Sequence, residues 1–236
     1  MIQPQENMKK ISVKKYQYCL FIVLMLIMTN CAKAPEVVKI SPPPPQVEVQ
    51  PTPQPELTPL DRWQMLVREN RYASIDKKLE SVNEFFNQFE FAEDLFLWGK
   101  SDYWATLIET LTKSSGDCED FTIAKYFTLR NLNVPDESMR ITYVMSLKSK
   151  APHMVLTLRR NSTEEPIVLD TNNNHLSPIS RRQDLVPVYS FNSNGYWIAK
   201  KEDGWDGKRL GDPSKLSLWA SVLERMNQSK SGYSDG

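Results

Sequence analysis

The residues best suited to chemistry lie in one short run that places the thiol of Cys118 among carboxyl groups. The run reads Ser115-Gly116-Asp117-Cys118-Glu119-Asp120-Phe121. Gly116 suggests a sharp backbone turn. The stretch that follows predicts a buried helix over 121–132, with Asp117 as its N-cap and Cys118 on its first turn. The positive end of a helix dipole favours thiolate over thiol, as a nucleophile requires. An inert core cysteine is the alternative.

Cysteine usage singles out this thiol. The chain has three cysteines, of which Cys19 lies in an N-terminal targeting segment and Cys31 at its end. Cys31 is expected to be either lipidated or removed. Only Cys118 then remains in the folded part, so no intrachain disulfide is expected.

A second pair of residues could serve the thiol. His153 begins one β-rich run and Asp170 ends another. If the two runs form a hairpin centred between Asn161 and Ser162, these residues lie directly opposite each other, with Cβ atoms about 5 Å apart. The carboxylate would then orient an imidazole able to take the thiol proton. The alternative is a histidine at a strand edge bonded to a neighbour.

The acids around the thiol need their own explanation. Asp117, Glu119 and Asp120 should raise the pKa of the thiol, which opposes nucleophilicity. A bound cation would cancel this effect, and clustered carboxylate oxygens suit Ca²⁺. Equally, the three acids could simply interact with the helix dipole. Residue types alone leave both interpretations open.

Helices precede strands along the chain. Apolar residues at helical spacing predict helices after Ser74 and over Tyr103–Thr112, before the helix that carries the thiol. Short β-rich runs follow, at Arg140–Leu147, His153–Leu158, Pro166–Asp170, Pro187–Phe191 and Tyr196–Ala199. Asp212-Pro213 opens a last amphipathic helix. This order predicts an α+β fold in which N-terminal helices pack on an antiparallel sheet.

The chain divides into four predicted parts. Residues 1–30 form a signal peptide, because basic residues precede an apolar run that is too short to span a membrane. Residues 31–59 combine a lipid-anchor cysteine, Cys31, with a proline-rich tether. Residues 60–227 form the folded domain, and 228–236 a flexible tail. Cleavage after Ala34, leaving a spacer without an anchor, is the alternative.

Charge and targeting limit the expected partners and location. The 236 residues carry 29 basic and 29 acidic side chains, so the net charge is zero and nothing points to nucleic acid. We expect a periplasmic protein that is held to a membrane only by its lipid.

The thiol run and its surroundings also resemble a known family. Residues 116–121 and Ala124-Lys125-Tyr126-Phe127 are similar to the nucleophile motif of the bacterial transglutaminase-like cysteine proteinases. The similarity covers roughly Ser101 to Trp197. It includes Tyr103-Trp104, Arg140, Tyr143-Val144, His153-Met154-Val155-Leu156, Val168-Leu169-Asp170, Arg182, Asp184-Leu185 and 187–192.

The resemblance implies a papain-like, transglutaminase-like fold and a Cys–His–Asp triad of Cys118, His153 and Asp170. It implies Ca²⁺ dependence, with Asp117 and Glu119 as the matching acids; Asp120 completes our predicted metal set. The implied substrate is the N-terminal region of a large surface adhesin, whose cleavage controls biofilm attachment and dispersal. The implied inhibitor is an inner-membrane cyclic-di-GMP receptor.

We therefore predict a calcium-dependent periplasmic cysteine endopeptidase. An acyltransferase or amidase is the alternative enzyme, because the same triad and thioester serve all three. A non-catalytic, lipid-anchored binding domain is the alternative outside catalysis.

Overall fold

The computed structural model describes residues 56–199 and 204–231. The predictions of a signal peptide, a lipid anchor at Cys31 and most of the tether fall on residues 1–55 and lie outside this part. Residues 232–236 of the predicted tail also lie outside it. Residues 228–231 belong to the last helix, so the prediction that the tail begins at 228 is wrong. No helix in the described ranges is long and apolar enough to cross a membrane.

Six α-helices are present in the described residues, most of them in the first half of the chain. They are α1 (Pro59–Asn70), α2 (Ile75–Phe86), α3 (Asp94–Trp98), α4 (Leu107–Lys113), α5 (Cys118–Asn131) and α6 (Ser217–Ser231). Short 3-10 turns are η1 (Asp136–Ser138), η2 (Ile179–Arg181) and η3 (Pro213–Lys215).

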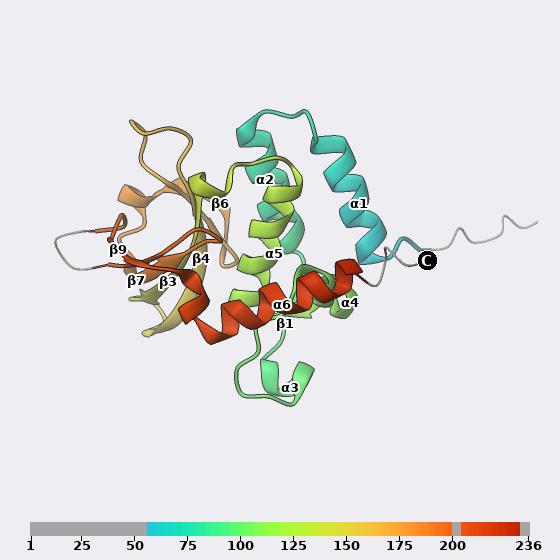
Figure 1. Ribbon diagram of the computed structural model, residues 1–236. Coiled ribbons are helices and arrows are strands. Elements are labelled where there is room, and N and C mark those ends of the chain that lie inside the picture. Colours follow the sequence, from blue (N-terminus) through green and yellow to red (C-terminus); the bar gives the residue numbers. More distant parts are fainter. Residues whose placement is uncertain (1–55, 200–203, 232–236) are drawn as a thin grey trace, which may run out of the picture. The chain divides into compact units, whose positions relative to one another are not determined.

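Seven of the strands form one antiparallel sheet in the order β6-β5-β4-β3-β7-β8-β9. Their bounds are β3 (Met139–Ser146), β4 (Ala151–Leu158), β5 (Ile167–Asp170), β6 (Asn173–Pro178), β7 (Leu185–Phe191), β8 (Tyr196–Ile198) and β9 (Lys208–Gly211). A separate parallel pair joins β1 (Glu90–Phe91) to β2 (Ser115–Gly116). Helices gather on one side and strands on the other (Figure 1), which confirms the predicted α+β fold.

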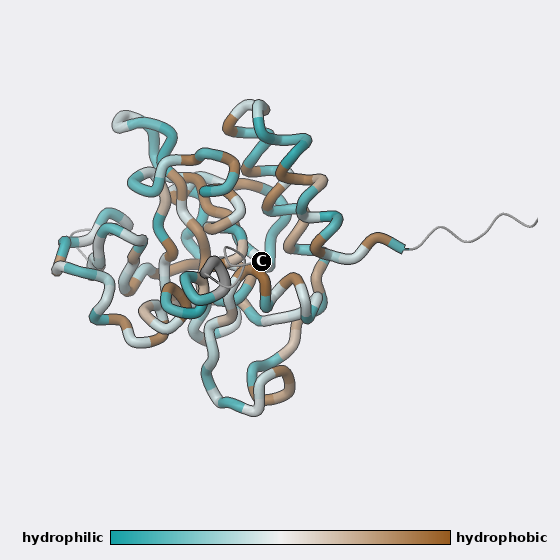
Figure 2. Tube along the Cα trace, turned by 45° about the vertical axis from the view of Figure 1, so that its right-hand side comes forward, coloured by the Kyte–Doolittle hydropathy of each residue, from teal (hydrophilic) through white to brown (hydrophobic). Residues whose placement is uncertain are grey.

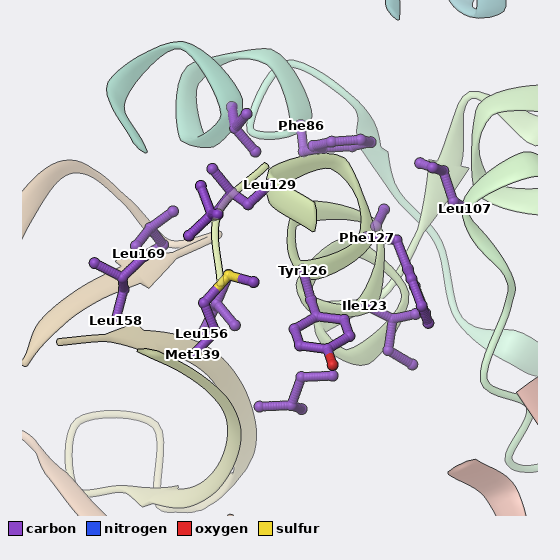
Figure 3. Packing of buried hydrophobic residues seen from close by; sticks show 14 of the residues in the cluster. Phe86, Leu107, Ile123, Tyr126, Phe127, Leu129, Met139, Leu156, Leu158 and Leu169 are labelled. Carbon is purple, nitrogen blue, oxygen red and sulfur yellow. The ribbon is translucent and has the colours of Figure 1, made fainter. Parts of the chain in front are cut away.

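Helix α5 lies at the centre of the core. Every residue from Asp120 to Leu129 is buried, because the helix packs against α2, α4 and the sheet. Strand residues such as Leu156 and Leu169 face it from one side, and Phe86 of α2 lies on another (Figure 3). Apolar residues gather where helices and strands meet, and polar residues mark the outer loops (Figure 2). A helix apolar on several sides was the sequence prediction, and burial confirms it.

The helix predicted from Tyr103 begins later, at Leu107. Thr106 forms a capping box with Glu109, since its hydroxyl accepts the Glu109 amide at 3.3 Å while the Glu109 carboxylate accepts the Thr106 amide at 2.7 Å. The preceding residues are extended. Their amides bond to acids elsewhere, as the Tyr103 amide does to Asp94 at 2.6 Å. The apolar pattern therefore placed the helix correctly, and the capping signal set its first residue.

This cap gives a testable stability effect. Thr106→Ala removes the hydroxyl that accepts the Glu109 amide, so the free energy of unfolding should fall by about 1 kcal/mol in urea denaturation. Thr112→Ala is the control, because that exposed hydroxyl only bonds back to the Ile108 carbonyl of its own helix. It should change the free energy by less than about 0.5 kcal/mol. Equal losses in both variants would show that the box does not stabilise α4.

Candidate active site

The parallel pair β1–β2 fixes the start of α5. Glu90 pairs with Ser115 and Phe91 with Gly116, and the Ala92 amide then donates to the Gly116 carbonyl at 2.8 Å. The chain leaves this pair through Asp117, the N-cap, and enters α5 at Cys118. The thiol therefore lies on the first turn of the buried helix, as the sequence predicted.

Gly116 is required for space. Its φ is not in the left-handed region, so freedom to turn does not explain the residue. A Cβ at this position would lie 2.8 Å from both Cβ and Oδ2 of Asp120. The glycine allows the strand end and the helix to approach each other closely, with Asp120 between them.

Asp120 faces the protein interior. Its Oδ1 accepts the Ala105 amide at 2.7 Å, and the residue is fully buried. Burial raises the pKa of Asp120 to about 7, although the bond from Ala105 acts in the opposite direction. This carboxyl group anchors the segment before α4 to the start of α5.

Asp117 and Glu119 meet a third acid that sequence reasoning missed. Carboxylate oxygens of Asp94, Asp117 and Glu119 all lie within 4.8 Å of one another. Among the described residues, Asp120 is not part of this group of three. Although Asp117 is the N-cap residue, its side chain makes no capping hydrogen bond, so the predicted capping role is wrong. The carboxylate faces the acid cluster instead.

The chemistry of this cluster suits a cation. Oδ1 of Asp94 and Oδ1 of Asp117 are buried and have no hydrogen-bond partner among the described residues. Burial, followed by the charges of its acidic neighbours, raises the pKa of Asp117. Buried oxygens without donors are costly, and a hard divalent cation takes such ligands. The three acids thus fit a metal site, although they supply only part of a full shell.

Burial raises the pKa of the Cys118 thiol far above its ordinary range, and the Glu119 carboxylate raises it further. The thiol donates a hydrogen bond to Glu119 Oε2 at 3.0 Å. The Met154 amide lowers the pKa, but it does not offset these effects. These effects oppose the helix dipole, so formation of the thiolate would require added positive charge beside Cys118.

His153 and Asp170 form a buried hydrogen bond. Nε2 of His153 lies 2.8 Å from Asp170 Oδ1. Arg182 donates to the other carboxylate oxygen of Asp170 at 2.7 Å and also to Asp184 at 2.8 Å. Burial raises the pKa of Asp170, but the bonds from His153, the Asn172 amide and Arg182 outweigh it and hold that pKa well below its usual range.

The predicted hairpin register is wrong by two residues. Strand β4 pairs with β5 as Leu156 with Leu169 and Thr157 with Val168, so His153 and Asp170 are diagonal neighbours. Because a shift of two keeps both side chains on one face, they still meet. The predicted pairing would place Leu158 opposite Glu165, whereas Leu158 pairs with Ile167. The polar turn between the strands is therefore two residues longer than predicted. The second histidine, His175, lies in β6 and is exposed.

A cleft of about 620 Å³ joins these groups. Cys118, His153 and the acid cluster line it, together with Trp104 and Tyr189. Trp104 is mostly buried and stacks on Phe191, with ring centroids 5.5 Å apart. One wall of the cleft is therefore aromatic, and the thiol of Cys118 and the imidazole of His153 line the same space.

Comparison with known proteins identifies the family. A family model described as bacterial transglutaminase-like cysteine proteinase BTLCP matches residues 60–202. The chain belongs to this family. It is similar to Legionella pneumophila LapG in a calcium-bound and an EGTA-treated structure, at 38% identity in both. The TM-scores are 0.62 and 0.64, and the matches cover 71% of this chain and 89% and 88% of those chains. No curated protein matches it.

In this transglutaminase-like cysteine proteinase, Asp94 is the site residue that sequence reasoning missed entirely. Parallel pairing of β1 with β2 carries the segment after each strand to the same place, which brings Asp94 to Asp117. The pair comprises two residues on each side, too few to show alternation, so no local signal points to it.

Removal of Arg182 should show how much the buried carboxylate depends on it. Arg182→Met leaves Asp170 short of a partner and should lower the free energy of unfolding by about 3 kcal/mol at pH 7. The folded-state pKa of Asp170 is lowered, so its ionised form stabilises the fold at any pH above the ordinary pKa of 3.8. This contribution to the free energy of unfolding is lost as the pH falls through the folded-state pKa. The deficit of the variant should therefore shrink in urea denaturation below pH 3.8.

The control for this experiment is Arg181→Met, which removes the neighbouring, exposed arginine. It should leave both the stability at pH 7 and its pH dependence nearly unchanged. A deficit at pH 7 in Arg182→Met no larger than that in Arg181→Met would contradict the role of Arg182 at Asp170.

Proposed function

We propose that the protein is a calcium-dependent cysteine endopeptidase with Cys118 as nucleophile, His153 as base and Asp170 as the group that orients the imidazole. One observation carries the proposal. The buried bond between His153 and Asp170 borders the same cleft as a thiol on the first turn of α5. Membership of the cysteine proteinase family supports the reaction class.

The hydrogen bond between His153 and Asp170 supports the following proposal for the proton transfers. Since His153 holds Asp170 through Nε2, Nδ1 is the ring nitrogen that accepts the thiol proton. The thiolate attacks the carbonyl carbon of the substrate, and the imidazolium then protonates the leaving amine. The acyl-enzyme thioester is hydrolysed by water that His153 deprotonates. Backbone amides on the first turn of α5 lack helical partners and suit the oxyanion that forms.

Asp94, Asp117 and Glu119 would hold the calcium ion. Bound Ca²⁺ supplies positive charge beside the thiol and offsets the carboxylates that raise its pKa. Calcium-bound and EGTA-treated structures of the similar Legionella protein support the choice of this ion. The proximity of their carboxylate oxygens, all within 4.8 Å of one another, supports the choice of these residues over Asp120, whose Oδ2 is also buried and unpartnered among the described residues.

We further propose that the substrate is the N-terminal region of a large surface adhesin, and that its cleavage controls attachment and dispersal of a biofilm. Similarity to LapG over most of both chains supports this substrate class. We place the enzyme in the periplasm, anchored through Cys31, with an inner-membrane cyclic-di-GMP receptor as inhibitor. These parts of the proposal rest on the sequence resemblance and on the N-terminal targeting pattern.

The decisive experiment is cleavage of a purified adhesin N-terminal fragment. The wild-type protein should cut it with Ca²⁺ and fail with chelator, and Cys118→Ala should lose activity by at least about a thousandfold. If Cys118→Ala cleaves the fragment as fast as the wild-type protein, Cys118 is not the nucleophile. Adding a labelled amine to the same reaction distinguishes a protease from an acyltransferase. An acyltransferase would incorporate the amine into the product, whereas a protease would release a free carboxylate.

A second experiment tests the metal ligands. Asp94→Asn should raise the Ca²⁺ concentration for half-saturation by about tenfold or more in calorimetric titration, because it neutralises one acid of the cluster. Asp120→Asn is the matched control. Its amide oxygen can still accept the Ala105 hydrogen bond, so calcium affinity should stay within about threefold of wild type. The opposite ranking would place the ion beside Asp120, as the sequence first suggested.

A further inference from the structure

Helix α5 carries a lysine in the centre of the protein. Lys125 is completely buried, and its Nζ donates to the side-chain oxygens of Asn83 at 2.8 Å and Asn87 at 2.6 Å. Burying an amine is costly unless its hydrogen bonds are made. The two asparagines, both supplied by or next to α2, provide them.

These bonds determine which way the two amides point. A lysine Nζ that donates to both side-chain oxygens turns both Nδ2 groups away from itself. Asn83 Nδ2 then donates to the carbonyls of Asn173 and Asn174 at 3.2 and 3.3 Å. Asn87 Nδ2 donates to the Asp170 carbonyl at 2.9 Å and to the side chain of Asn174 at 2.7 Å.

Every acceptor in this second layer lies on one of the two strand ends that the turn at 171–172 joins, at Asp170 of β5 or at Asn173 and Asn174 of β6. Within that turn, the Asn172 amide donates to Asp170 Oδ1 at 2.9 Å, on the oxygen that also binds His153. The shape of the turn therefore sets the direction of the carboxylate. If the amides were reversed, each would present oxygen to a carbonyl oxygen, and the turn would lose these contacts.

We propose that Lys125 is a positioning residue, which acts through Asn83 and Asn87 to hold the turn of Asp170 against the helix that carries Cys118. Lys125 follows Cys118 by seven residues, which is two turns of α5, so both lie on the same side of the helix. One rigid element thus places the nucleophile and, further along, the support of the orienting carboxylate. The inference rests on the triad proposed above.

The charge of Lys125 is not what the arrangement requires. Burial lowers the pKa of Lys125 to about 7, and the negative charge of Asp170 opposes that shift. Two oxygens face the amine, and both the charged and the neutral forms have at least two N–H groups to donate. The amides are therefore oriented on either side of neutral pH.

A second lysine offers a matched control. Lys78 also joins α2 to α5, because its Nζ donates to the Leu132 carbonyl at 2.9 Å. That contact lies at the far end of α5 from Cys118 and does not involve the turn of Asp170. Lys125→Met and Lys78→Met each remove one lysine bridge between the same two helices, and only the first removes the support of the carboxylate.

In adhesin cleavage, Lys125→Met should lower kcat by about tenfold to a hundredfold with little change in KM, because small errors in catalytic geometry are costly. Lys78→Met should stay within about twofold of wild type at equal folded fraction. Asn87→Ala keeps the lysine but removes the bond to the Asp170 carbonyl, so it should lower kcat in the same way. The double variant of Lys125→Met and Asn87→Ala should lose less activity, expressed as free energy, than the sum of the two single losses. Both changes break the same chain of hydrogen bonds.

A readout independent of activity separates this inference from the proposed function. The chain has two histidines, so His175→Gln leaves the ring N–H of His153 as the histidine signal in a proton NMR spectrum. Wild type and Lys78→Met should show a protected ring proton, and Asn87→Ala and any folded Lys125→Met should lose it. If the wild type cuts no adhesin, the proposed substrate fails while this signal still tests Lys125. A protected proton in Asn87→Ala, or kcat in Lys125→Met equal to that of Lys78→Met, would overturn the inference.

Discussion

The structure depends on burying a helix that carries charge. From Asp120 to Leu129, α5 has no solvent-exposed side, yet this stretch includes a carboxyl group and an amine. Both must find partners inside the protein, and neither finds them on α5. Asp120 takes the Ala105 amide before α4, while Lys125 takes two asparagines from α2. Polar contacts of one buried helix thus join its apolar packing in holding the elements around the cleft.

Electrostatics at the thiol run against nucleophilicity in the chain by itself. Burial, followed by the Glu119 and Asp117 carboxylates, raises the pKa of Cys118, whereas the hydrogen-bond partners of Asp170 lower the pKa of that carboxyl group. The thiol of Cys118 and the pair of His153 and Asp170 therefore differ in how their charge states are set. The base and its orienting group are assembled by protein contacts alone, and the nucleophile requires a change of local charge. A protease built in this way would be inactive wherever calcium is scarce.

Sequence reasoning predicted most of what depends on local patterns. The α+β class, the buried helix with Cys118 on its first turn, and the position of His153 and Asp170 on one sheet face all follow from periodicity, capping and strand alternation. It failed where the deciding contact joins distant segments. The two-residue β1–β2 pair brings Asp94 close to Asp117. Nothing in the sequence distinguishes the buried Lys125 from a lysine on the surface. Gly116 was noticed, but its reason, the proximity of Asp120, appears only in three dimensions.

The segment that carries Asp94 projects away from the rest of the domain around α3 (Figure 1). The short β1–β2 pair and the bond between Asp94 and the Tyr103 amide hold it in place. An ion held by Asp94 and Asp117 would close this excursion into a ring, as a crosslink does. Calcium binding would then have to offset the conformational entropy of closing this loop. The entropy of the free segment would thereby influence the calcium concentration at which the enzyme becomes active.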